Sequence, residues 1–134
     1  MQITGAFLAL DARIVEDKLN VVGGVVDWLS VPRAGKADEA GQPVVGYAYL
    51  VTLMQAGPDD HQRPYRMTVE MINSEGESRV VDDGQISVDA HRGENRFWVT
   101  PFGMQAEKEG RMVLVVTIEG GGSVSVPVHI TLED

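Results

Sequence analysis

The strongest constraint on the fold is a strict alternation of apolar and polar residues near the end of the chain. The apolar residues are Val124, Val126, Val128, Ile130 and Leu132, and the residues between them are Ser123, Ser125, Pro127, His129 and Thr131. Successive side chains of a β-strand point to opposite sides, so this pattern predicts a half-buried strand with a wet outer face. Pro127 has no amide hydrogen to donate, so we expect that side of the strand to lie at a sheet edge.

The same period of two recurs along the chain, interrupted by turn-forming residues. Further strands are predicted at Ile3–Leu10, Ala12–Val15, Leu19–Val22, Val25–Val31, Val44–Met54, Tyr65–Asn73, Val80–Val88, Arg96–Thr100 and Met112–Ile118. Turn signals lie at residues 16–18, 57–60, 73–76, 82–84 and 120–122. About eight to ten short strands at this spacing predict a single all-β domain over residues 1–134, an antiparallel β-sandwich or a barrel-like sandwich. Residues 34–41, rich in small and charged side chains, are predicted to form a mobile loop.

Two of the predicted strands carry apolar residues on both faces. In the strand at 44–54, one face holds Tyr47, Tyr49, Val51 and Leu53, and the other holds Ala48, Leu50 and Met54. In the strand at 112–118, the second face carries Val113 and Val115. A sandwich strand normally has one wet face, so something must cover the other. A loop or small helix of the same chain is one explanation, and a protein interface is the second.

Aromatic residues fall in or beside the predicted strands, where most are expected to belong to the core. Phe97 and Trp98 are adjacent, so they must point to opposite faces, and one of them is expected outside. Pro101 favours extended backbone at Thr100 and is predicted to end the strand there. The candidate interface residues are therefore Trp28, Tyr47, Tyr49, Trp98, Val113 and Val115.

Charge and composition exclude several classes of function. The chain has 11 Lys and Arg against 20 Asp and Glu, with no basic run, which argues against nucleic acids and anionic membranes as partners. It has no cysteine, which excludes disulfides, a thiolate nucleophile and a Cys-ligated zinc. No secretory-signal pattern and no apolar stretch of about 20 residues is present, so we expect a cytoplasmic protein.

No arrangement of residues in the sequence points to a metal. His61, His91 and His129 are isolated from one another and are interpreted as solvated surface residues. The pairs Asp59-Asp60 and Asp82-Asp83 lie in predicted turns and would bind calcium only if those turns met at one end of the sandwich. Asp and Gly are also the residues that tight turns require. We therefore expect no metal and no cofactor.

No arrangement points to catalysis either. The serines have no GxSxG context, and the run Gly120–Gly122 is followed by neither a lysine nor a helix, so it is interpreted as a hairpin turn. Paired carboxylates for glycoside hydrolysis are not singled out.

Three segments carry a resemblance to a known family. They are GAFLALDARIVEDKLNVVGG at residues 5–24, Val31-Pro32, and VTPFGMQAEKEGRMVLVVTIEG at residues 99–120. Together they resemble a family of small bacterial proteins of unknown function, of about this length and common in actinobacteria. The family's acidic hairpin has a glycine that is absent here between Asp17 and Lys18, which leaves the turn type open. The resemblance implies an all-β single domain and assigns no activity and no site residue.

The sequence is best interpreted as a non-catalytic interaction or structural module, including self-association, whose partner is a protein or a second copy. One alternative is a β-sandwich that binds carbohydrate or calcium through its loops. The other is a hydrolase whose catalytic residues the sequence does not reveal. Whether the chain is an enzyme stays open, with a non-catalytic role favoured.

Overall fold

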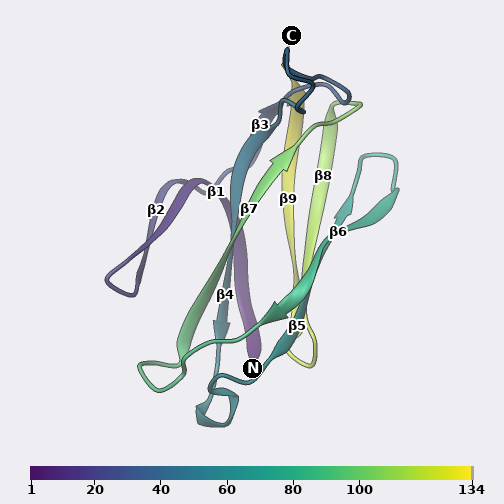
Figure 1. The fold of residues 1–134 in the computed structure, drawn as a ribbon. Helices are drawn as coiled ribbons and strands as arrows, with labels where there is room; N and C mark the ends of the chain where they lie inside the picture. Colours follow the sequence, from purple (N-terminus) through teal and green to yellow (C-terminus); the bar gives the residue numbers. More distant parts are fainter. Residues whose placement is uncertain (134) are drawn as a thin grey trace.

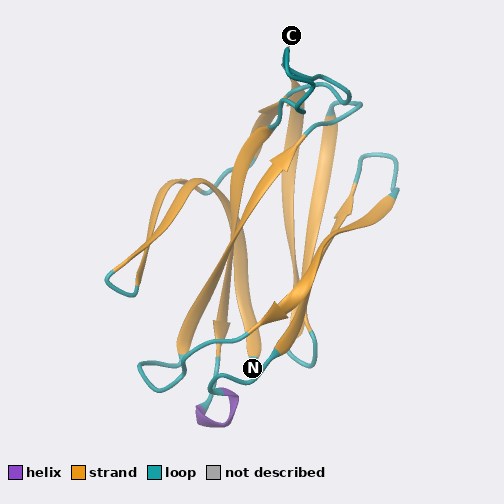
Figure 2. Cartoon of the chain, viewed as in Figure 1, coloured by secondary structure: helices purple, strands orange, loops and turns teal. Residues whose placement is uncertain are grey.

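The chain forms two β-sheets packed face to face, as described for residues 1–133 by a computed structural model (Figures 1 and 2). The strands are β1 (Gln2–Val15), β2 (Lys18–Gly24), β3 (Trp28–Val31), β4 (Gly46–Gln55), β5 (Tyr65–Ile72), β6 (Ser78–Ile86), β7 (Asn95–Met104), β8 (Gly110–Ile118) and β9 (Gly122–Leu132). The order in sheet A is β2-β1-β4-β7, and in sheet B it is β3-β9-β8-β5-β6. The all-β sandwich predicted from the sequence is confirmed.

The last strand, β9, behaves as its alternation predicts. Val126, Val128 and Ile130 are buried in the core, and the residues between them face outward. β9 pairs with β8 on one side from Gly122 to Ile130, whereas β3 pairs in parallel with its other side only from His129 onward. Pro127 therefore lies just before the segment of β9 that pairs with β3. Its missing amide hydrogen removes no hydrogen bond between these two strands.

The core fills the space between the two sheets. Both sheets contribute to it, with Leu8 and Leu50 from sheet A and Leu114 and Ile118 from sheet B fully buried. The helical structure described is one short 3-10 turn, η1 (Pro58–Asp60). Among residues 1–133, no helix is long and apolar enough to cross a membrane.

β1 and β2 form the hairpin that the sequence predicts. Val15 pairs with Lys18, which leaves Glu16 and Asp17 as a two-residue turn with φ of 52° and 61°. Positive φ at both positions is the type I′ geometry that two-residue hairpins favour, here adopted without glycine. β1 pairs with β4 only as far as Ala9. Residues 10–24, which we call the β1–β2 arm, pair with each other except at Gly24, which pairs with Ala9, and they project from the sandwich at the left of Figure 1.

A predicted turn and a predicted strand end are wrong on edge strands, and the strands predicted separately at Ile3–Leu10 and Ala12–Val15 form the single strand β1. Asp82 and Asp83 do not form a turn but lie inside β6, the last strand of sheet B. Pro101 does not end β7, which continues to Met104 at the edge of sheet A. An edge strand tolerates such residues because one side of its backbone forms no ladder hydrogen bonds.

The loop predicted at residues 34–41 is present and exposed, without a helical turn. Asp38 accepts hydrogen bonds from the amides of Ala40 and Gln42, and Gln105 from beyond β7 donates to the carbonyls of Lys36 and Val44. Hydrogen bonds within the loop and from the Gln105 side chain therefore hold its conformation. Its mobility stays a prediction.

Candidate functional site

The side of sheet A that faces away from the core is apolar across three strands. Cross-strand partners share a face, so the register defines this surface row by row. The rows are Gly5–Leu53–Phe97, Phe7–Val51–Val99, Ala9–Tyr49–Pro101 and Tyr47–Gly103. We call these eleven residues the sheet A outer face, and none of them is charged. The apolar residues predicted on both faces of β4 are thus confirmed.

The sheet A outer face is already packed at its centre. Val51 and Ala9 expose none of their surface, yet neither belongs to the core cluster between the sheets. Phe7, Leu53, Phe97 and other neighbours around them are half-buried, whereas Tyr47 at one end is 69% exposed. The face is therefore a second apolar layer that solvent reaches mainly at its margins.

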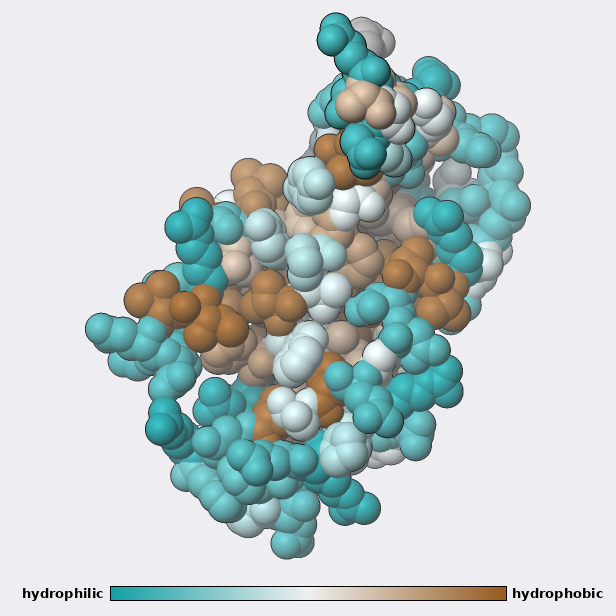
Figure 3. Space-filling view, viewed as in Figure 1, coloured by the Kyte–Doolittle hydropathy of each residue, from teal (hydrophilic) through white to brown (hydrophobic). Residues whose placement is uncertain are grey.

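The β1–β2 arm adds exposed apolar side chains beside this face. Nine large hydrophobic side chains of the described residues are exposed, and seven of them lie on sheet A or directly after β2. They are Leu10, Ile14, Val15, Val21, Val22, Val25 and Tyr47. The space-filling view shows hydrophobic atoms gathered over the arm at the left (Figure 3). Large exposed apolar patches on soluble proteins commonly mark interaction sites.

Glycines and one ion pair fix the direction of the arm. Gly23 has φ of +68°, and an ideal Cβ there would lie 2.8 Å from Leu10 Cδ1, so the Leu10 side chain occupies the space over it. At Gly24, an ideal Cβ would lie 2.9 Å from Val21 Cγ1 and 3.3 Å from Phe7 Cε2. Val21 of the arm therefore lies near Phe7 of the sheet A outer face.

The tip of the arm is tied to the loop before β7. Arg92 Nη1 donates to Asp17 Oδ2 at 2.7 Å, across 75 positions of sequence. Both side chains are more than two-thirds exposed, so this pair contributes little to stability and serves mainly to orient the arm.

The structure separates the candidate interface residues that the sequence suggested. Tyr47 and Tyr49 lie on the sheet A outer face, whereas Val113 and Val115 lie half-exposed on the outside of sheet B, opposite Pro127 and Ser125. The prediction of one patch containing all four is wrong, because β4 and β8 belong to different sheets.

The two tryptophans also differ in placement. Trp98 is half-buried and packs against the core, while its neighbour Phe97 faces outward, as adjacency predicts. Trp28 is 63% exposed on β3. Its ring lies 4.2 Å from the His129 ring, and its indole nitrogen donates to Thr131 Oγ1 at 3.2 Å. Trp28 is thus held on the sheet B side of the molecule.

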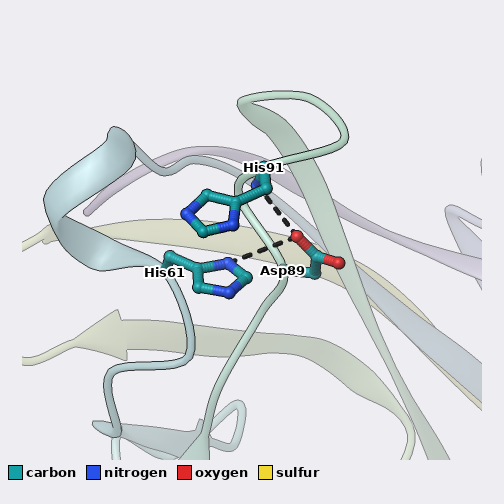
Figure 4. Close-up of side chains that lie close together, drawn as sticks. All are labelled: His61, Asp89 and His91. Atoms are coloured by element: carbon teal, nitrogen blue, oxygen red, sulfur yellow. Dashed lines mark hydrogen bonds and ion pairs between the residues drawn. The ribbon is translucent and has the colours of Figure 1, made fainter.

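A second candidate site lies in two turns at the end of the sandwich where the chain begins (Figure 4). His61 follows η1, and Asp89 and His91 lie in the segment between β6 and β7. The two imidazole rings stack with centroids 3.4 Å apart and an angle of 11° between their planes. Asp89 Oδ1 lies 3.2 Å from His61 Nδ1, and the Ala90 amide donates to the same nitrogen at 3.2 Å.

The Asp89 carboxylate is held in its ionised form. The His91 amide donates to Asp89 Oδ1 at 2.8 Å, and this hydrogen bond, with His61 and Arg92 nearby, lowers the pKa of Asp89 below its ordinary 3.8. His61 is mostly buried, with 21% of its side chain exposed, whereas His91 is exposed. The three side chains offer one ligand atom each, all within 4.8 Å of one another.

The prediction that all three histidines are isolated is wrong for His61 and His91. The two are 30 positions apart in sequence and meet because both turns lie at the same end of the sandwich. The only local signal is the spacing of Asp89 and His91, which an extended segment points to one side. His129 lies on the outer side of β9, as predicted.

The acidic pairs considered for calcium do not converge in residues 1–133. Asp60 accepts hydrogen bonds from the Tyr65 hydroxyl, the N-terminal ammonium group and the Gly57 amide, which together lower its pKa to about 2. Asp83 is held by Arg66 through two hydrogen bonds, of 2.8 and 3.0 Å. Asp60 and Asp83 therefore already have partners from the chain.

Comparison with known proteins adds no relative to these observations. The resemblance to small actinobacterial proteins stays a prediction. No protein-family model matches the chain, and no curated protein matches it.

Proposed function

We propose that this protein is a non-catalytic interaction module. It docks a protein partner on the sheet A outer face and the β1–β2 arm, and the partner that we favour is a second copy of the chain. The absence of cysteine suits a reducing compartment, so a cytoplasmic role is part of the proposal.

One observation carries this proposal: the sheet A outer face has eleven residues and no charge. A two-sheet sandwich needs one apolar face on each sheet, and the opposite faces are normally polar. Interface centres are depleted in charged residues and enriched in aromatic ones, and this face includes Phe7, Tyr47, Tyr49 and Phe97. The arm beside it is a two-stranded ribbon, which is marginally stable alone and gains from being covered.

Charge opposes a second copy less at the β1–β2 arm than over the chain as a whole. The whole chain carries a net charge of −9, so most of its surface repels another copy. The arm carries three acidic residues, Asp11, Glu16 and Asp17, and two basic ones, Arg13 and Lys18, which is close to balance. β2 is also an edge strand, with backbone groups available for pairing across a two-fold axis.

Light scattering at increasing protein concentration tests this proposal. We expect a mass above the 14.6 kDa of one chain, rising with concentration. Tyr47→Asp and Val22→Asp place a carboxylate on side chains that are 69% and 66% exposed, so folding should be retained while association is lost.

Val80→Asp is the matched control, because Val80 is 61% exposed but lies on β6 of sheet B. It should associate like the unchanged chain. A chain that stays at 14.6 kDa at every concentration would exclude the second copy as the occupant. If Tyr47→Asp, Val22→Asp and Val80→Asp all lost association equally, sheet A would not be the docking surface.

A further inference from the structure

We propose that His61, Asp89 and His91 bind one divalent transition-metal ion of the zinc class. This site lies apart from the docking surface proposed above. It stands on the proximity of three ligand-bearing side chains from two separate turns, with a solvent-exposed side where water can complete the coordination.

The donor set selects the kind of ion. Two imidazole nitrogens and one carboxylate oxygen suit zinc, cobalt and nickel, whereas calcium and magnesium prefer oxygen ligands alone. Three protein ligands with an open position are the usual number for a zinc ion that keeps bound water.

Part of the geometry is already in place. Zinc bonds of about 2.0–2.2 Å at tetrahedral angles put two ligand atoms roughly 3.4 Å apart. His61 Nδ1 and Asp89 Oδ1 are 3.2 Å apart, which is close to that separation. The Ala90 amide donates to His61 Nδ1 at 3.2 Å, which holds this nitrogen beside the carboxylate oxygen. A cation between the two atoms would take the place of this long hydrogen bond.

His91 has to turn for the ion to bind. In the stacked arrangement its ring is nearly parallel to that of His61, and one ion cannot lie in both ring planes. Ligand atoms up to 4.8 Å apart must also approach, by on the order of 1 Å. His91 is exposed, so rotation of its ring meets little resistance. Separation of the stack is therefore an expected sign of metal binding.

Asp89 is also positioned by a second partner. Its other oxygen, Oδ2, lies 4.0 Å from Arg92 Nε, and Arg92 is hydrogen-bonded to Asp17 at the tip of the β1–β2 arm. Asp89 can therefore offer Oδ1 to the ion while Oδ2 stays oriented by the guanidinium, as outer partners commonly orient metal ligands.

Titration with Zn²⁺ and with Co²⁺, on protein freed of any purification tag, tests the site. We expect one ion per chain by calorimetry, visible Co²⁺ absorption, and shifts of the His61 and His91 ring signals in NMR spectra. His91→Ala should weaken binding at least about tenfold, because even residues that only orient ligands cost 10–100-fold when changed. His61→Ala and Asp89→Asn should weaken it as well.

His129→Ala is the matched control. It removes one of the three histidines of the chain, but at a position beside Trp28 in sheet B. Its affinity for both ions should equal that of the unchanged chain. His91 is exposed, so His91→Ala is expected to keep the fold, and circular dichroism verifies this. Absence of saturable binding would overturn the proposal. So would a folded His91→Ala variant that binds like the unchanged chain, or equal loss in His129→Ala.

Discussion

The outer faces of the two sheets are built from different kinds of residue. Sheet A turns Phe7, Val51, Val99 and their neighbours outward, with no charge among eleven positions. Sheet B turns out mostly polar residues, the serines and threonines of β9, β8 and β5 and the ion pair Arg66–Asp83, with Val113 and Val115 among them. Both sheets contribute apolar inner residues to one core.

The comparison of the two outer faces shows which apolar residues the sandwich needs to form its core. Sheet B shows that a sheet of this sandwich needs only a mostly polar outer face that includes charge, since its inner residues alone supply its share of the core. The apolar outer residues of sheet A are therefore not needed to close the core. That excess is the reason for proposing sheet A as the docking surface.

Substitution of valine by threonine on each outer face should give the largest contrast. Val51→Thr buries a hydroxyl where no surface is exposed, and an unpaired buried hydroxyl costs about 1–3 kcal/mol. Val115→Thr, half-exposed on sheet B, should change the free energy of unfolding by less than about 0.5 kcal/mol. Urea unfolding of both variants measures the difference. Equal losses would mean that the two faces are equally exposed in solution.

A pair of glycine substitutions compares the arm with the body of sheet A. Gly23→Ala should cost about 1–2 kcal/mol, because φ is +68° and the new Cβ would meet Leu10. Gly5→Ala should be neutral or slightly stabilising, since an ideal Cβ there has no neighbour within 4 Å. Urea unfolding gives the two values, and hydrogen exchange should show faster exchange of arm amides only in Gly23→Ala. Faster exchange throughout the sheet would show that the arm does not open independently.

Thr52, the residue after Val51, allows the reverse substitution, from threonine to valine. Thr52 is fully buried on the inner face, and its hydroxyl has no hydrogen-bond partner. Thr52→Val should therefore stabilise the protein by about 1 kcal/mol, which corresponds to roughly 3–5 °C in Tm. Thr68→Val on the half-exposed outer side of sheet B should leave Tm almost unchanged. A lower Tm for Thr52→Val would indicate that a water molecule or a local shift satisfies the hydroxyl.

Local patterns were sufficient to predict the strands and their buried faces. The alternation from Ser123 to Leu132 fixes which residues of β9 face the core, because the pleat repeats every two residues. The same rule predicted that Phe97 and Trp98 diverge, and that β4 is apolar on both sides. Errors arose at Asp83 and Pro101, where turn-forming residues are accommodated by edge strands. Strand order, which decides where the edges lie, is not a local property.

The candidate sites depend on that same non-local information. Tyr47 and Val113 both lie on second apolar faces, but only the assignment of β4 and β8 to different sheets shows that they cannot share a surface. His61 lies in the turn before β5 and Asp89 in the segment after β6, and the pairing of these two strands brings them together across 28 positions of sequence. Neither turn contains a sequence motif that would predict its contact with the other.

Lowering the pH should protonate Asp83 on the outer face of sheet B, whereas the outer face of sheet A should not change. Two hydrogen bonds from Arg66 lower the pKa of Asp83 below its ordinary 3.8. A carboxylate whose pKa is lowered by folding stabilises the protein above its unfolded pKa, and this contribution is lost as pH falls from about 3.8 through the folded value. Both side chains are about half exposed, so the effect on stability is small and screened by salt.

The pKa itself therefore measures this contrast better than the free energy of unfolding does. Following the Asp83 carboxyl carbon by NMR should give a low pKa in the unchanged chain, and a value nearer 3.8 in Arg66→Gln, where the guanidinium is gone. The methyl signals of Val51 and Val99 should not respond to this titration, because the sheet A outer face carries no carboxyl group. An unchanged Asp83 pKa in Arg66→Gln would show that the pair is not formed in solution. The outer face of sheet B would then contain charged side chains that interact with water and not with each other. The two outer faces would differ only in how strongly water solvates their residues.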